Sequence, residues 1–215
     1  MKLNEPFVIT ISREIGSGGR TVGRKLAARL GVRYSDKQLI RSLKEKFNLT
    51  VSGIEKLKGQ KKNWLADFIQ MVAPVPKANM LADADSKYLQ EVRQDVSVKD
   101  VYTAEKEILR GIADQGSCVI AGRSGFFVLK DHPEKVDIFI TASREKRIER
   151  VMRKQELSRE QAEALIDSVD ESRENYVKRF TGLSRYDARN YNLVLNMDYL
   201  TEDEAVAIIL AYLGV

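Results

Sequence analysis

Residues 7–31 read FVITISREIGSGGRTVGRKLAARLG, and this stretch decides the fold. Its first part, Phe7–Ile11, joins aromatic and β-branched side chains without a charge, which predicts a short buried strand. The turn that follows tolerates positive φ and the close approach of another group, because it holds three glycines: Gly16, Gly18 and Gly19. Thr21 opens a helix with one apolar face, and Gly31 is placed to cap its C-terminal end. Strand, glycine turn and helix N-terminus together predict a phosphate site, because free N–H groups and the positive end of the helix dipole point the same way.

The glycine turn departs from the standard phosphate loop, G-x-x-x-x-G-K-[ST], at the positions of its first glycine and its lysine. Arg13 stands where the first glycine belongs, and Gly19 stands where the lysine belongs. Either Arg20 or Arg13 can supply the missing charge, and the sequence does not choose between them. We therefore expect the phosphate loop to comprise Arg13, Gly16, Ser17, Gly18, Gly19, Arg20 and Thr21. Two alternatives stay open: a tight glycine turn without a ligand, and a dinucleotide fingerprint, whose G-x-G-x-x-G pattern meets Thr21 at its last position.

The whole chain has 215 residues and 43% hydrophobic content, which fits a single domain over residues 1–215. Its net charge of +5, from 36 basic and 31 acidic residues, suits an anionic small molecule and does not require a nucleic acid. The lone Cys118 lies in an apolar run, so we expect a buried thiol, no disulfide and a cytoplasmic protein. No apolar stretch approaches the ~20 residues of a membrane span, and no membrane partner is expected. With His132 as the single histidine, no residue is assigned as a metal ligand.

Strand and helix patterns alternate along the rest of the chain. Five strands are expected, at Phe7–Ile11, Val32–Tyr34, Cys118–Ala121, Val136–Thr141 and Asn192–Asn196. Alternation of this kind predicts an α/β fold in which a five-stranded parallel sheet is covered by helices on both faces, as a three-layer sandwich. A helical insert is expected at about 52–100. Capping boxes are expected where Ser158 precedes Gln161 and where Thr201 precedes Glu204.

Several charged residues fall where such a sheet binds its ligand, at the carboxyl ends of the strands. Asp36 follows the second strand, and Arg123 follows the third, where its planar fork could grip a phosphate in two places. The helix beginning near Ser143 carries Arg147, Arg150 and Arg153 on one face. This row is expected to form a lid over about 143–160 that neutralises a transferring phosphoryl group. The competing interpretations are a surface arginine at position 123 and a solvated helix with charge pairs.

Four stretches carry a resemblance to a known family: residues 9–21, Tyr34–Lys37, Val119–Arg123, and the tract from Asp170 through Arg173 and Tyr176 to Gly182. They are similar to stretches of the cytidylate kinase-like family, relatives of bacterial CMP kinase among the nucleoside monophosphate kinases. The resemblance implies a P-loop kinase fold and Mg²⁺-dependent phosphoryl transfer from ATP to a nucleoside monophosphate such as CMP or dCMP. Two positions depart from strict CMP kinases, which have a lysine where Gly19 stands and an aspartate where Ser124 stands.

The resemblance also implies roles for individual residues. The catalytic candidates are Arg20, Arg123, Arg150 and Arg173. The ATP-binding candidates are the loop residues named above together with Arg147, Arg150 and Arg153. The candidates for binding the acceptor are Asp36, Lys37, Arg41, Arg123, Arg173 and Tyr176.

Three functions are therefore compared. The leading hypothesis is a nucleoside monophosphate kinase that positions and neutralises phosphates without a side-chain nucleophile. The second is a nucleotide-binding regulatory protein without turnover, suggested by the missing lysine. The third is an NAD-dependent oxidoreductase with Asp36 on the ribose, which leaves the arginines after Ser143 unexplained. The sequence does not indicate an oligomeric state.

Overall fold

The computed structural model describes residues 4–36 and 98–215. The chain divides into two units, Met1–Asp36 with Leu109–Val215, and Lys37–Ile108. The first unit holds the sheet and every predicted site residue except Lys37 and Arg41, which lie outside the described residues together with most of the predicted helical insert. Within the described ranges, no helix is both long and apolar enough to cross a membrane.

The sheet has five strands, all parallel, in the order β2-β3-β1-β4-β5. Their bounds are β1 Val8–Arg13, β2 Arg33–Ser35, β3 Cys118–Ala121, β4 Lys135–Thr141 and β5 Leu193–Asn196. The sequence prediction of a five-stranded parallel sheet is confirmed. Because all five strands run parallel, their carboxyl ends lie at one edge of the sheet.

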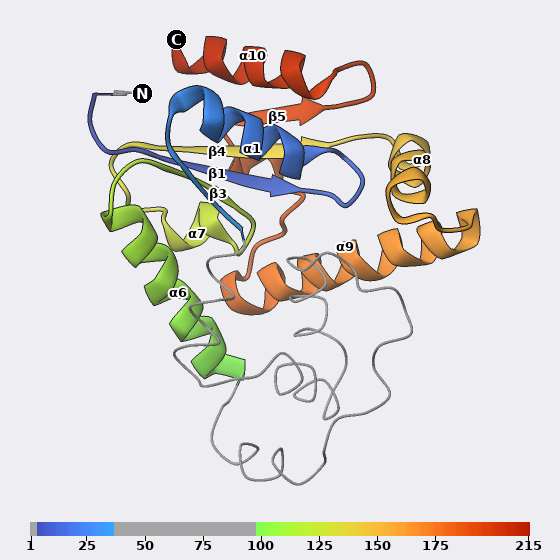
Figure 1. Ribbon diagram of the computed structural model, residues 1–215. Coiled ribbons are helices and arrows are strands. Elements are labelled where there is room, and N and C mark those ends of the chain that lie inside the picture. The colour runs from blue at the N-terminus through green and yellow to red at the C-terminus, as the bar shows by residue number, and fades with distance from the viewer. Residues whose placement is uncertain (1–3, 37–97) are drawn as a thin grey trace, which may run out of the picture. The chain divides into compact units, whose positions relative to one another are not determined.

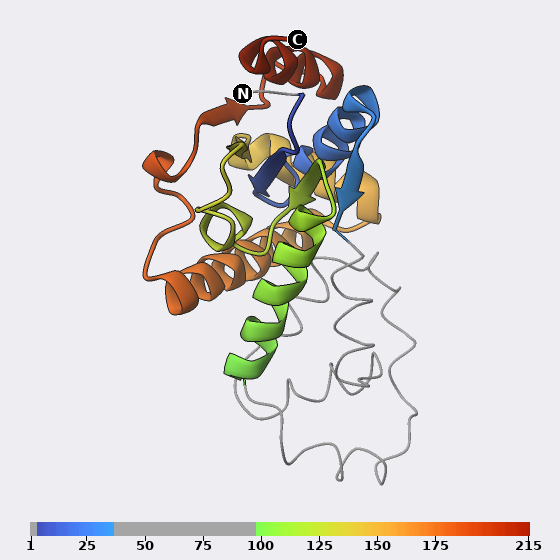
Figure 2. The same ribbon diagram turned by 90° about the vertical axis from the view of Figure 1, so that its left-hand side faces the viewer.

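Helices cover both faces of this sheet (Figures 1 and 2). On one face lie α1 Gly19–Leu30 and α10 Glu202–Leu213, and on the other lie α7 Gly125–Val128 and α9 Arg159–Thr181 (Figure 1). The main core fills the first of these spaces, where alternate residues of β1 and β4 meet the apolar faces of α1 and α10. Lys25 of α1 also pairs with Asp203 of α10 at 2.7 Å. The sheet is thus fixed between two helical layers, which makes its strand ends a rigid platform.

Two further helices complete the chain order. The helix α6 Val98–Asp114 precedes β3, and α8 Arg144–Gln155 follows β4 and stands beyond the carboxyl ends of the strands (Figure 1). A smaller apolar cluster joins α8 to α9 through Ile148, Val151, Ala162 and Ile166. A 3-10 turn, Ala188–Asn190, leads into β5. Neither α7 nor this turn was predicted, because each is too short to show a helical period.

Helix ends follow the capping signals of the sequence. The Ser158–Gln161 and Thr201–Glu204 capping boxes are both present, and Gly31 ends α1 in the left-handed conformation, φ 66°. The predicted start of α1 at Thr21 is wrong by two residues: the helix begins at Gly19, because Gly18 adopts φ 87° and serves as its N-cap. The strand β1 likewise continues to Arg13, since it keeps its register with β4 up to Ile140.

The core position predicted for Cys118 is confirmed. Its side chain is fully buried on β3, and burial raises the pKa of its thiol to about 11. A thiol that stays protonated at neutral pH is a poor nucleophile, so Cys118 acts as a small apolar residue.

Candidate active site

The strand order places the glycine loop where the sheet changes direction. After β1 the chain crosses to the β2–β3 side, and it later returns to form β4 and β5 on the opposite side of β1. Ligands of open α/β sheets bind at such a switch point, outside the carboxyl ends of the strands. The residues that meet here come from β1, the loop after it, α8, α9 and the segment after α9.

The glycine loop is closed by its own hydrogen bonds. The Ser17 hydroxyl donates to the carbonyl of Glu14 at 2.9 Å, and the N–H of Gly19 points to the Ser17 oxygen at 3.4 Å. Gly16 and Gly18 adopt φ 80° and 87°, and their N–H groups form no hydrogen bond within the described part of the chain. Two free N–H donors beside a helix N-terminus form an anion-binding concavity.

Helix α8 packs directly on this loop. A Cβ on Gly16 would lie 2.6 Å from the backbone oxygen of Arg147, so glycine is required there for contact as well as for its φ. The guanidinium of Arg150 lies over Gly18, where a Cβ would meet its Nη1 at 1.9 Å. That Nη1 is buried and has no hydrogen-bond partner among the described residues, while Nη2 lies 3.3 Å from Glu202. Arg150 therefore presents an unsatisfied donor at the loop.

Asp170 on α9 contacts several buried charged groups. Its carboxylate accepts from the loop N–H of Ile15 at 3.1 Å and from Arg147 at 2.5 Å. It also accepts from Arg173 at 3.1 Å and lies 3.4 Å from the Nη1 of Arg185. One carboxylate thus ties the loop to three arginines of three different segments. Asp170 is a positioning residue, because it faces the loop backbone and the arginines.

Arg173 and Arg185 also clamp the end of β1. Both donate to the backbone oxygen of Arg13, at 3.0 and 2.5 Å. Burial, followed by the charges of Arg13 and Arg185, holds the pKa of Arg173 well below its ordinary value. Three cations held this close in a dry environment repel one another, and a bound anion would relieve that repulsion.

Arg20 and Asp36 form an ion pair of their own. The Nε of Arg20 lies 2.7 Å from the Asp36 carboxylate, and Asp36 is buried while Arg20 is about a third exposed. Asp36 thus lies at the same edge as the loop, but its carboxylate is already engaged by an arginine.

The structure brings most of the predicted site residues together and separates a few. Arg123 is buried at the end of β3 and adopts φ 64°, a left-handed conformation that is uncommon for a residue other than glycine. Arg153 is exposed on α8, whereas Arg147 is buried and Arg150 is partly buried. Tyr176 is buried on α9 and packs against Phe180, with ring centroids 5.0 Å apart.

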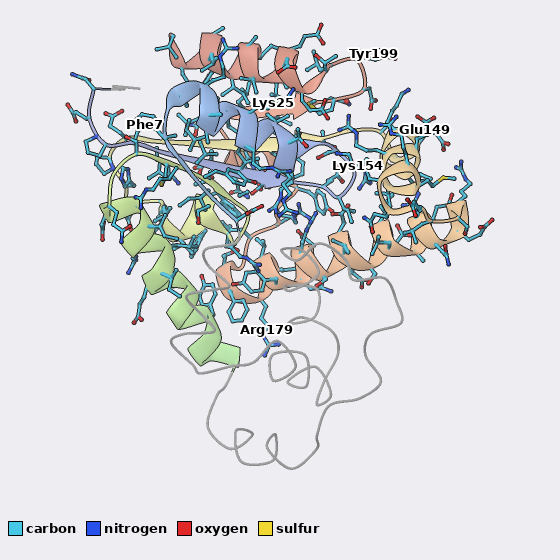
Figure 3. All side chains as sticks on the ribbon, in the orientation of Figure 1. Phe7, Lys25, Glu149, Lys154, Arg179 and Tyr199 are labelled. Atoms are coloured by element: carbon cyan, nitrogen blue, oxygen red, sulfur yellow. The ribbon has the colours of Figure 1, made fainter. Side chains whose placement is uncertain are left out.

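Three functional candidates were missed from the sequence. Arg185 is buried to 3% exposure and lies over the rings of Phe139 and Tyr186, yet in the sequence it appears as one of several basic residues after α9. Asp170 was noted in the motif tract without a role. Glu14, inside the loop, accepts from Thr141 and lies 3.6 Å from Arg147. By contrast, Arg179 on α9 is exposed and points away from the sheet (Figure 3).

Comparison with known proteins decides the family. The cytidylate kinase-like family matches residues 8–199, which is most of the chain. The chain belongs to the cytidylate kinase-like family. A cytidylate kinase from Sulfurisphaera tokodaii is 26% identical over 212 residues, covering 97% of this chain and 96% of that protein.

Solved structures share the fold of this cytidylate kinase-like chain. An uncharacterized protein from Eubacterium ventriosum has a TM-score of 0.66 at 21% identity, covering 97% of this chain and 98% of that one. A shikimate kinase from Bacteroides thetaiotaomicron has a TM-score of 0.54 at 14% identity, covering 97% and 99% of the two chains.

Family and fold together support a phosphotransferase that binds a nucleotide. The strand order agrees, because the dinucleotide-binding fold places β2 beside β1, whereas here β3 lies between them. The oxidoreductase hypothesis also needs Asp36 to bind ribose hydroxyls, and Asp36 is paired with Arg20. Both observations weigh against it.

Proposed function

We propose that this protein transfers a phosphoryl group from ATP to a nucleoside monophosphate, with CMP or dCMP as the acceptor. One observation carries the proposal: the excess of buried positive charge around the glycine loop. Among the described residues, four buried arginines lie around the loop: Arg13, Arg147, Arg173 and Arg185. Two carboxylates contact these arginines: Asp170 contacts Arg147, Arg173 and Arg185, and Glu14 lies 3.6 Å from Arg147.

A polyphosphate fits this excess of charge. Buried charges are costly unless they are paired, so arginines that outnumber their carboxylates favour a state with bound anions. Phosphoryl transfer also needs what this edge offers, namely positioning and neutralisation of developing charge. In this proposal, the loop and α8 hold the ATP phosphates, while Arg123 and Arg173 face the phosphate of the acceptor.

Mg²⁺ would be held by few protein atoms. Magnesium in kinase sites keeps several waters and binds phosphate oxygens together with one or two protein oxygens. The donor set fits this pattern: Thr21 offers a hydroxyl in the first turn of α1, and no cluster of three or more acidic, His or Cys side chains occurs in the described ranges. The ion would supply charge neutralisation between the phosphate groups.

A panel of acceptors at fixed ATP and Mg²⁺ tests the proposal. We expect ADP release above the acceptor-free rate with CMP or dCMP, and lower kcat/KM with UMP, AMP and shikimate. Shikimate is included because its kinase shares the fold. Turnover with shikimate and none with any nucleotide would reject the nucleotide acceptor while keeping the phosphotransferase.

The second candidate is a nucleotide-binding protein without turnover, which the glycine at the lysine position favours. Saturable ATP binding by calorimetry, with no ADP release for any acceptor, would establish this candidate in place of the kinase.

A further inference from the structure

Two departures from the phosphate-loop motif touch each other in the structure. Arg13 replaces the first glycine, and Gly19 replaces the lysine. A Cβ on Gly19 would lie 2.7 Å from the Cβ of Arg13 and 3.2 Å from its Cγ. No real Cβ sits that close to another carbon, so the Arg13 side chain passes through the space that a side chain at position 19 would need. Arginine at 13 and lysine at 19 are mutually exclusive in this fold.

The far end of Arg13 meets a second glycine. At Gly122, directly after β3, a Cβ would lie 2.2 Å from the Nη1 of Arg13. The side chain therefore runs from the end of β1, past the start of α1, to the end of β3. Its guanidinium thus lies beside Gly122, the residue before Arg123, which is expected to face the acceptor.

The Arg13 guanidinium has no carboxylate partner in the described part of the chain. Its side chain is 6% exposed, and the hydrogen bonds from Arg173 and Arg185 reach its backbone oxygen, not its side chain. Burial lowers the pKa of Arg13, yet a guanidinium stays protonated in proteins. A buried cation without a counter-ion is the arrangement that a bound anion completes.

The other two candidate cations each pair with a carboxylate. Arg20 is tied to Asp36 at 2.7 Å, and Arg150 reaches the loop from α8 while its Nη2 lies 3.3 Å from Glu202. Arg13, by contrast, lies against Gly19, where the lysine side chain of a standard loop begins.

We propose that Arg13 supplies the phosphate-binding charge that the lysine supplies in a standard loop, and that Gly19 and Gly122 lack side chains to make room for it. This inference rests on the proposed kinase function. The charge comes from the strand before the loop and not from the helix after it. Arginine at position 13 and glycine at position 19 together move one positive side chain from position 19 to position 13.

A double-mutant cycle tests the exchange. Arg13→Met removes the charge and keeps the volume, and we expect kcat to fall by about 10²–10³, the usual effect of deleting one charge-stabilising donor. Gly19→Lys alone should also lose activity, because its side chain collides with Arg13. Arg13→Gly combined with Gly19→Lys should recover kcat to within about tenfold of the wild type. Such recovery is strongly non-additive, as expected of side chains that compete for one space.

Arg29→Met, an arginine exposed on the last turn of α1, is the matched control and should leave kcat unchanged. Circular dichroism and thermal unfolding of each variant show whether the chain is folded. If Arg13→Met is folded and keeps its kcat, or if the double variant is folded and stays as inactive as Gly19→Lys, the proposal is wrong. A loss of kcat in Arg20→Met together with a silent Arg13→Met would assign the role to Arg20.

Nucleotide affinity separates this inference from the kinase proposal. If the wild type shows no turnover with any acceptor, the Kd for ATP can still be measured by calorimetry. We expect Kd to rise severalfold or more in Arg13→Met and to return toward the wild-type value in the double variant. An unchanged Kd in an otherwise inactive protein would reject the role of Arg13 independently of the reaction.

Discussion

At the scale of single residues, Asp170 is the side chain on which the site geometry depends most. It joins the loop N–H of Ile15 to the guanidinium groups of Arg147, Arg173 and Arg185. Removing one partner of a buried charge network leaves the others uncompensated, which costs far more than losing an exposed pair. The residue that is not expected to touch a substrate is therefore expected to be among the most sensitive.

We expect Asp170→Asn to lower the free energy of unfolding by about 3–5 kcal/mol, because three buried arginines lose their shared carboxylate. Asp167→Asn, one turn earlier on α9, is the matched control. Asp167 pairs with Arg144 at 2.5 Å, but both side chains are about half exposed and solvent screens the pair, so its loss should change stability little. Urea unfolding of both variants measures the difference. Equal losses would contradict a network centred on Asp170.

Arg123 provides a second test at this scale. Because its φ is 64°, asparagine is a better replacement than alanine, since asparagine tolerates the left-handed conformation. We expect Arg123→Asn to reduce kcat/KM for the acceptor roughly ten- to a hundredfold, the effect of losing a charge-assisted, two-pronged contact. The KM for ATP should change little. Unchanged acceptor kinetics would remove Arg123 from the site.

At the scale of elements, α8 is the helix whose position relative to the loop matters. Its N-terminal half is docked, with Arg147 held by Asp170 and packed on Gly16. Further along, Arg150 reaches the loop with one unsatisfied nitrogen, and Arg153 is exposed. The lid motion over 143–160 stays a prediction, and these contacts indicate which part of α8 is expected to move. Ile148 and Val151 pack α8 against α9, so the end of the helix after Val151 is the part expected to respond to ligand.

Hydrogen exchange measures this response. We expect amides of α8 and of the turn after it to exchange more slowly when ATP and an acceptor are both bound, because the arginines then hold phosphates. Amides of α10 serve as the internal control, since its apolar face belongs to the main core and should not respond. Equal protection of α8 with and without ligands would favour a static, solvated helix.

At the scale of the whole molecule, the folded state concentrates positive charge at one edge of the sheet. Among the described residues, four buried arginines gather around the loop: Arg13, Arg147, Arg173 and Arg185. Buried cations that outnumber their carboxylates repel one another, and we expect a bound anion to reduce that repulsion. The stability of the protein should therefore depend on the anions present.

We expect ATP at 100 times its Kd to stabilise the protein by about 2.7 kcal/mol, and thus to raise Tm by roughly 5–10 °C for a chain of this size. Inorganic phosphate should raise Tm less, and chloride at matched ionic strength should have little effect, because it does not span several arginines. Differential scanning calorimetry provides the measurement. A Tm that is the same in chloride, phosphate and ATP would show that the buried arginines need no anion.

The sequence by itself determined the elements and the general place of the site. Glycine positions, capping boxes and apolar runs are local signals, so β3, both capping boxes and the end of α1 at Gly31 were predicted correctly. The rule that parallel strands end at one edge was enough to expect the loop, Asp36 and Arg123 on the same side.

What only the tertiary structure decided is which charged groups meet. Asp170 contacts Ile15 and Arg185 contacts the backbone of Arg13 across more than 150 residues of chain, and Arg13 passes beside Gly19 because of how β1 enters α1. Such contacts depend on how strands and helices pack, and no local pattern in the sequence carries that information.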